Sequence, residues 1–262
     1  MQITYDFSGK IVLVTGGGSG IGRASSEAFG AAGAIVAVAD ISEKNGLETV
    51  EAIRAAGGTA EFIFVDVSNE ESVKAMIKSV VDTFGTLDIA HNNAGIEGNH
   101  IPLAELPSDN WRQVIDVDLT SVFYCLKAEI PEMMKNGGGA IVNTASASGL
   151  IGGYNLSVYT AAKHGVIGLT KAAAMDYANK GIRINSICPG AIDTPFIAAL
   201  PKPLIDRVTF ATPMDRLGQP REIAQSVLWL CSDASSYVTG HSLSVDGGVV
   251  LGGTGTRFDD LI

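Results

Sequence analysis

A serine, a tyrosine and a lysine in the middle of the 262-residue chain have the types and spacing of an acid–base group. Tyr159 and Lys163 are four residues apart in a segment of helical period, so their side chains share a face. A phenol has a pKa of about 10, and a nearby positive charge lowers it, so Tyr159 can exchange a proton with an oxygen atom. Ser146 follows an apolar run, where its hydroxyl can hold that oxygen. An ordinary tyrosine and lysine on a helix surface are the alternative interpretation.

A glycine-rich turn follows the first apolar run of the chain, Ile11–Thr15. Gly16 permits a tight turn, Gly20 leaves room for a pyrophosphate, and Gly22 lets the next helix pack closely. The N–H groups at the start of that helix, together with its dipole, attract phosphate groups. Glycine-rich loops are common, but this one opens a strand–helix–strand unit, as a dinucleotide site requires. The residues expected beside the phosphates are Gly16, Ser19, Gly20, Ile21 and Gly22.

An aspartate ends the second apolar run. Asp40 follows Gly22 by eighteen residues, the separation at which a carboxylate binds the ribose hydroxyls of a dinucleotide. It would repel a 2′-phosphate, and neither Gly17 nor Ile41 supplies a positive charge beside this ribose. The sequence therefore favours NAD over NADP, unless Asp40 only caps the helix that starts near Ser42.

A further aspartate follows the third apolar run. Asp66, with Val67 after it, is placed to bind the edge of the adenine ring. Capping of the helix at Ser68 is the alternative, and the sequence does not decide between them.

These residues stand at the ends of short apolar runs that alternate with longer stretches of helical period. Continuous runs are typical of parallel strands that are covered on both faces, and Glu70–Phe84 carries one apolar stripe, as a helix does. The pattern predicts an α/β, doubly wound Rossmann fold with about seven parallel strands and helices on both faces. The expected strands are Ile11–Thr15, Ala34–Ala39, Glu61–Val65, Leu87–Ala90, Ala140–Thr144, Ile182–Ile187 and Ser242–Val245.

Five motifs, in order, resemble the short-chain dehydrogenase/reductase family over roughly residues 9–248. The part from Tyr159 to Thr170 is especially similar to its single-domain alcohol dehydrogenases and ketone reductases. The resemblance implies an NAD(H)-dependent oxidoreductase that interconverts a secondary alcohol and its ketone by hydride transfer. The motifs are Thr15–Gly22, Asn92–Gly95, Ser146, Tyr159–Lys163 and Pro189–Gly190.

The same resemblance assigns roles to individual residues. It implies catalysis by Ser146, Tyr159 and Lys163, with Lys163 also bridging the hydroxyls of the nicotinamide ribose. It places Asn93 on the adenosine side of the cofactor. Ile192 and Thr194 would hold the carboxamide of the nicotinamide.

One position departs from the family. Asp118 stands where members usually carry an asparagine that anchors a water in a proton relay. An ionised carboxylate accepts hydrogen bonds but donates none. Near Lys163 it would favour the ammonium form and oppose the tyrosinate of Tyr159. Asp118 is therefore a candidate catalytic residue with an altered relay.

Composition and charge exclude other classes. The 18 Lys and Arg and 28 Asp and Glu give a net charge of −10, which is unsuited to nucleic acid or an anionic membrane. No apolar run reaches the roughly 20 residues that cross a bilayer, and residues 1–10 lack the core of a secretory signal. The four histidines have no metal-ligand spacing, so no metal is expected. The odd number of scattered cysteines favours a reducing compartment, and we expect a cytoplasmic protein.

The chain is expected to form one domain, 1–262, with a substrate lid at about 195–218 and a tail at 249–262. Apolar lid residues, with Leu150 and Ile151, favour an uncharged, apolar alcohol or ketone substrate, cyclic or terpenoid-like. Packing of the lid onto the domain is an equal alternative. The tail either reaches a neighbouring subunit or ends as a frayed terminus.

Two central helices, around Trp111–Met134 and Ser157–Ala178, carry apolar residues on more than one face, which is typical of a covered surface. The resemblance implies that these helices pair across a dimer axis and that the chain forms a homotetramer. The apolar residues concerned are Val122, Phe123, Val166, Leu169 and Met175.

Two other functions deserve comparison. A dinucleotide-sensing regulator would bind NAD without turnover, but it would not need Ser146, Tyr159 and Lys163 together. A 3-oxoacyl reductase acting on a carrier-bound thioester would use NADPH and offer basic residues to its acidic carrier. Asp40 and the negative net charge disfavour that reading.

Overall fold

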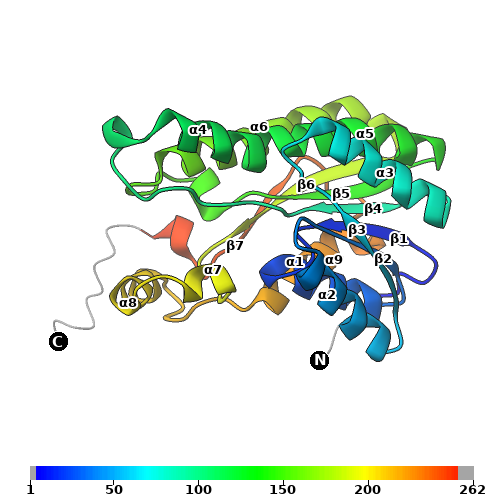
Figure 1. Cartoon of the computed structure of the whole chain (residues 1–262), viewed down its shortest axis with the longest axis horizontal. Helices are drawn as coiled ribbons and strands as arrows, with labels where there is room; N and C mark the ends of the chain where they lie inside the picture. The colour runs from blue at the N-terminus through cyan, green and yellow to red at the C-terminus, as the bar shows by residue number, and fades with distance from the viewer. Residues whose placement is uncertain (1–3, 253–262) are drawn as a thin grey trace.

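The computed structural model describes residues 4–252 and shows a parallel sheet between two layers of helices (Figure 1). Its seven strands lie in the order β3-β2-β1-β4-β5-β6-β7. The predicted doubly wound fold is therefore confirmed. The strands are β1 (Ile11–Thr15), β2 (Ile35–Asp40), β3 (Thr59–Phe64), β4 (Ile89–Asn92), β5 (Gly139–Thr144), β6 (Ile182–Pro189) and β7 (Ser242–Val245).

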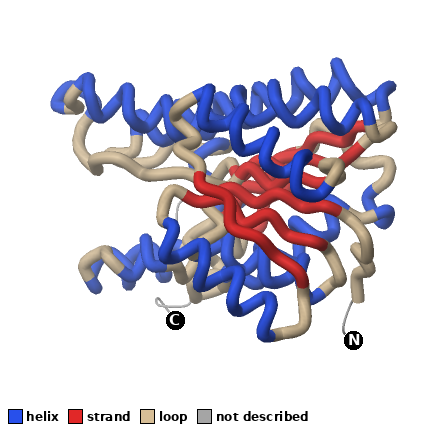
Figure 2. Tube along the Cα trace, turned by 45° about the vertical axis from the view of Figure 1, so that its right-hand side comes forward, coloured by secondary structure: helices blue, strands red, loops and turns tan. Residues whose placement is uncertain are grey.

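Helices cover both faces of the sheet (Figure 2). In Figure 1, α3 to α6 lie above the sheet and α1, α2 and α9 lie below it, each layer with its own apolar core. The short helices α7 and α8 extend beyond the lower layer. The helices are α1 (Gly20–Ala31), α2 (Glu43–Ala55), α3 (Glu70–Phe84), α4 (Ser108–Ile115), α5 (Ser121–Lys135), α6 (Ser157–Tyr177), α7 (Pro195–Ala198), α8 (Lys202–Ala211) and α9 (Pro220–Cys231).

Two predicted strands are shifted along the chain, for identifiable reasons. β3 lies at the sheet edge and alternates between buried and exposed residues, so its apolar run does not mark its start. Leu87 is buried ahead of β4, whose paired residues begin at Ile89, although the backbone of Asp88 already bonds to Ile11 and Ala140. The apolar run therefore starts before the strand itself.

The helix above β4 and β5 is interrupted. Between α4 and α5, the segment Asp116–Thr120 forms a single π-helical turn, and Asp118 within it is fully buried. π turns place one extra residue in a helix and often occur at functional sites. Here the turn carries the residue that departs from the family.

The three cysteines lie in three different layers. Cys125 is in α5, Cys188 in β6 and Cys231 in α9, and all three are buried free thiols. The tail predicted at 249–262 lies, from residue 253 onward, outside the described residues.

Candidate active site

The glycine turn between β1 and α1 has a backbone shape that favours glycine. Gly16 and Gly20 have φ angles of +63° and +51°. A Cβ on Gly22 would lie 2.0 Å from the carbonyl oxygen of Gly16, so α1 starts directly against the turn. Ser19 precedes α1 without a side-chain capping bond, so the first N–H groups of the helix are available to an anion. This geometry fits the pyrophosphate of a dinucleotide, and the first turn of α1 includes the predicted Ile21.

Asp40 lies at the end of β2 beside the same turn. Its Oδ2 accepts the N–H of Gly18 at 2.8 Å, and its Oδ1 accepts the N–H of Ser42 at 2.8 Å. Ser42, and not Asp40, is the N-cap of α2. A carboxylate has about four lone-pair sites, so two remain for ribose hydroxyls. Ile41, which is 64% exposed, is the next residue and brings no charge.

Asp66 lies two residues beyond the end of β3. Its Oδ1 accepts the N–H of Ser68 at 3.0 Å and the hydroxyl of Ser68 at 2.6 Å. These bonds close a turn ahead of α3, whose N-cap is Asn69, so the helix-capping role offered as the alternative is not seen at Asp66. Val67 is buried.

Asn93 ties the end of β4 to the end of β1. Its N–H donates to Oγ1 of Thr15 at 2.9 Å, and its side-chain amide donates to the carbonyl of Thr15 at 3.2 Å. The strand order reverses between β1 and β4, which is where doubly wound folds bind their ligands. Asn93 therefore stands beside the glycine turn, as the resemblance implied.

Ile192 and Thr194 follow β6 on the other side of this turn. Thr194 Oγ1 donates to the carbonyl of Ile192 at 3.2 Å, and Ile192 is buried. A Cβ on Gly20 would lie 3.2 Å from the side chain of Thr194. The absence of a side chain at Gly20 thus lets this loop lie close to α1. Gly20 is also expected to leave room for the phosphates.

The structure brings Ser146, Tyr159 and Lys163 together. Ser146 lies two residues beyond β5, where its Oγ accepts the N–H of Ser148 at 3.1 Å. The Nζ of Lys163 lies 5.4 Å from the centre of the Tyr159 ring on the same face of α6. A hydrogen bond with Ser146 acts to lower the pKa of Tyr159. The three groups form one cluster at the carboxyl edge of the sheet.

Lys163 is buried and held in place by two oxygens. Its Nζ donates to the carbonyl of Thr144 at 3.1 Å and lies 3.0 Å from Oδ2 of Asp118. Burial is the largest single effect and lowers the pKa of Lys163, but the attractions of Asp118 and Tyr159 and the hydrogen bond with Asp118 act against it, so the pKa is raised overall. An ammonium group has three donors, and the third is what a ribose hydroxyl requires.

The charge of Asp118 reaches the tyrosine as well. Burial raises the pKa of Tyr159, Lys163 opposes this, and Asp118 adds to it, so the pKa is raised overall. Asp118 thus disfavours the tyrosinate form of Tyr159, as the sequence predicts. Lys163 does lower the pKa of Tyr159, as the sequence suggested, but desolvation of the phenol is the larger effect. Asp118 is fixed in turn by the N–H of Ile96, which donates to its Oδ1 at 2.8 Å.

Glu97 lies next to this cluster, and no motif pointed to it. The side chain is 18% exposed and forms a hydrogen-bonded pair with His100. Burial raises the pKa of Glu97, and repulsion from Asp118 adds to the effect. The only signal in the sequence is an acidic residue two positions after the Asn92–Gly95 turn.

The predicted lid contains α7 and α8, and its apolar side chains are not in the core. Phe196 is 43% exposed and Leu204 is 37% exposed. Leu150 and Ile151, after Ser146, are each 39% exposed. These side chains therefore keep apolar surface that packing onto the domain leaves uncovered. The other apolar lid residues, Ile197, Leu200 and Val208, are half-buried.

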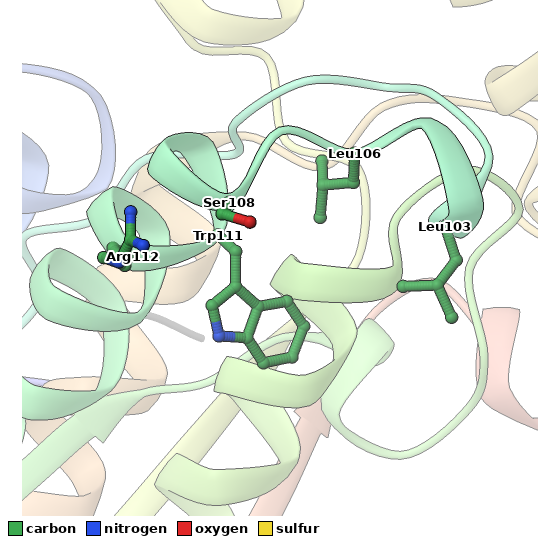
Figure 3. A pocket seen from close by; sticks show the side chains of 5 residues that line it. All are labelled: Leu103, Leu106, Ser108, Trp111 and Arg112. Carbon is green, nitrogen blue, oxygen red and sulfur yellow. The ribbon is translucent and has the colours of Figure 1, made fainter.

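A hollow of about 370 Å³ lies at the start of α4, apart from the cluster (Figure 3). None of its lining residues belongs to the predicted site. Trp111, one of the lining residues, is 39% exposed. The lining residues are Leu103, Leu106, Ser108, Trp111 and Arg112.

Within residues 4–252, no group of three or more His, Cys, Asp or Glu side chains is arranged to hold a metal ion. Over the same residues, the helices are too short or too polar to cross a membrane.

Known proteins resemble the chain along almost its whole length. A family model described as enoyl-(acyl carrier protein) reductase matches residues 16–250. The chain is 48% identical to cyclohexanol dehydrogenase of Acinetobacter sp. (strain SE19), over 92% of this chain and 95% of that protein. It is 46% identical to 2,5-dichloro-2,5-cyclohexadiene-1,4-diol dehydrogenase of Sphingobium indicum, over 93% of this chain and 98% of that protein.

A solved structure agrees with these relatives. Levodione reductase superposes with a TM-score of 0.92 at 36% identity, over 94% of this chain and 100% of that chain. The glycine turn and the cluster of Ser146, Tyr159 and Lys163 stand on this shared fold. The chain belongs to the short-chain dehydrogenase/reductase family.

Proposed function

We propose that this oxidoreductase uses NAD(H) to interconvert a secondary alcohol and its ketone on an apolar ring. The observation that carries the proposal is the cluster of Ser146, Tyr159 and Lys163 beside the glycine turn. Bound NAD supplies the hydride acceptor, and NADH the donor. Relatives named for cyclohexanol and for a cyclohexadiene-diol support a ring substrate.

In the proposed mechanism, Tyr159 moves the proton. Ser146 holds the substrate oxygen by a hydrogen bond, and Tyr159 accepts the hydroxyl proton during oxidation or donates one during reduction. Lys163 stabilises the tyrosinate that oxidation requires, since its attraction lowers the pKa of Tyr159. Asp118 keeps Lys163 protonated and in position through the 3.0 Å contact.

The preference for NAD rests on Asp40. The carboxylate is fixed by two backbone N–H groups at the edge of the phosphate turn, and Ile41 brings no positive charge toward a 2′-phosphate. We expect kcat/KM with NAD to exceed that with NADP by at least tenfold, or about 1.4 kcal/mol. Asn93, Ile192, Thr194 and Lys163 complete the proposed cofactor site, and Asp66 with Val67 flanks its adenine end.

The apolar substrate is supported by the exposed side chains of the lid and of Leu150 and Ile151. An apolar ring bound there would cover surface that the chain leaves in water, and each square ångström so covered contributes about 25 cal/mol. This is the role we assign to residues 195–218.

The test compares cofactors and substrates in one assay. Cyclohexanol should be oxidised with NAD, and cyclohexanone reduced with NADH, at rates well above those for a short-chain 3-oxoacyl thioester. Asp40→Asn should narrow the gap between NAD and NADP, whereas Glu43→Gln, at the exposed start of α2, should leave it unchanged. Equal use of both cofactors by the native chain would overturn the NAD assignment, and binding of NADH without turnover of any ketone would favour a sensor.

The proposed assembly is a homotetramer in the cytoplasm. Phe123 and Met175, on α5 and α6, are 46% and 84% exposed and support a covered surface on the upper layer. Val122 and Val166 do not, because both lie in the core. Leu169 is half-buried. The free cysteines support a reducing compartment.

A further inference from the structure

The loop that follows β4 holds one acidic side chain in a fixed position beside the catalytic cluster. On one side of Glu97, the N–H of Ile96 donates to Asp118 at 2.8 Å. On the other side, the N–H of Asn99 donates to Oδ1 of Asn110 on α4 at 3.0 Å. Gly98, between them, has a φ of +75°, and a Cβ there would lie 2.5 Å from Val114. The loop is therefore pinned to the upper layer both before and after Glu97.

The side chain of Glu97 is mostly withdrawn from water, on a loop that passes the catalytic cluster. Its side chain is 18% exposed, although it is a carboxylate on a loop. Gly95 approaches the cluster so closely that a Cβ there would lie 3.1 Å from Oδ2 of Asp118 and 3.4 Å from Nζ of Lys163. The raised pKa of Tyr159, due mainly to burial, includes a contribution from the charge of Glu97. These groups are thus within electrostatic range of one another.

The role of Glu97 is not explained by the reaction. Proton transfer needs Tyr159, with Ser146 and Lys163, and Asp118 already neutralises Lys163. The single polar partner that the structure gives Glu97 is His100, whose side chain is 32% exposed. A carboxylate has about four lone-pair sites, so Glu97 can accept further hydrogen bonds besides the one with His100.

We infer that Glu97, oriented by His100, binds a second hydroxyl group on the substrate ring. This inference rests on the proposed function and names the substrate class within it, a cyclic diol or hydroxyketone. A carboxylate oxygen accepts the hydrogen bond of a hydroxyl, whereas the rest of the pocket wall, from Leu150, Ile151 and the lid, offers apolar contact. The diol in the name of the Sphingobium relative has this chemistry. A site built around such a bond discriminates strongly against an analogue that lacks the hydroxyl.

The experiment compares two substrates that differ by one hydroxyl group, cyclohexanol and trans-cyclohexane-1,4-diol, with NAD. For the native chain, kcat/KM should be at least tenfold higher for the diol. Glu97→Leu should remove most of that ratio, mainly by raising KM for the diol, because the second hydroxyl does not react. Glu97→Gln keeps an acceptor oxygen and should retain part of the ratio. Glu105→Leu, at an exposed position of the same connection, should leave the ratio as in the native chain.

The possible outcomes distinguish a failure of the Glu97 inference from a failure of the proposed function. Equal losses for both substrates in Glu97→Leu would mean that Glu97 only supports the loop, and would overturn the inference while the proposed function stands. A native chain that does not distinguish the substrates would also overturn it. Failure to oxidise either ring alcohol would refute the proposed function, and with it this inference.

Discussion

At position 118 the chain carries a carboxylate where its family usually has an amide, and the structure shows what that charge contacts. Asp118 lies against Lys163 and raises the pKa of both Lys163 and Tyr159, in each case beside a larger effect of burial. In the proposed mechanism oxidation requires the tyrosinate, so we expect its rate to rise with pH as Tyr159 loses its proton. At the residue scale, Asp118 is therefore expected to set the pH range in which the site is active.

Replacing Asp118 by asparagine should move the pH profile of oxidation to lower pH. The sign follows from the charge: removing a negative group lowers the pKa of Tyr159, so the tyrosinate forms at lower pH. The profile of log(kcat/KM) against pH for cyclohexanol measures this, with Asp116→Asn as the neighbouring control. An unchanged profile would place Asp118 outside the proton path.

Tyr159→Phe should lower kcat by about two to four orders of magnitude, because it removes the group that transfers the proton and keeps the ring. NADH binding, followed by fluorescence titration, should stay close to native, since the phosphate turn is separate from Tyr159. Native turnover in this variant would show that another group transfers the proton.

The proposed catalytic and cofactor residues can be identified from the sequence because their types and order are specific. Asp40 at a strand end, the spacing of Tyr159 and Lys163, and the odd residue at Asp118 all stand out. Glu97 does not, because its position depends on bonds from Ile96 and Asn99 to residues far along the chain. The direction of the Tyr159 pKa also depends on burial, which side-chain types do not reveal.

At the scale of elements, close contacts between segments carry the cofactor site. Gly22→Ala should weaken NAD binding at least tenfold, because its Cβ would lie 2.0 Å from the carbonyl of Gly16 and force the turn away from α1. Gly168→Ala in α6 is a matched control, since its Cβ meets nothing within 4 Å. Calorimetric titration with NAD measures both. Native affinity in Gly22→Ala would mean that the turn adapts without cost to the cofactor.

Some elements follow their sequence patterns and others do not. β1, β7 and α3 have the predicted bounds. β3 does not, because its buried residues are interrupted by exposed ones and form no continuous apolar run. The π turn at Asp116–Thr120 was not predicted from the sequence, because it is defined by a change of hydrogen bonding within a helix and not by a change of residue type.

At the scale of the whole molecule, the exposed apolar side chains of the upper layer suit a partner surface. Light scattering at micromolar concentration should give the mass of four chains. Met175→Glu should reduce that mass, because a charge at a buried interface is costly, while Leu47→Glu on α2 should not. A monomeric native chain would refute the proposed assembly.

Each layer of the fold contains one buried thiol whose reactivity reports the opening of that layer. Burial raises the pKa of Cys125 far above its usual value, that of Cys188 to about 11 and that of Cys231 to about 12. Alkylating reagents attack the thiolate, so the folded chain should resist them at all three positions. Each cysteine then reacts only when its own element opens: α5 above the sheet, β6 within it, or α9 below. The order in which the three become labelled during mild denaturation would show which layer separates first, without any engineered probe.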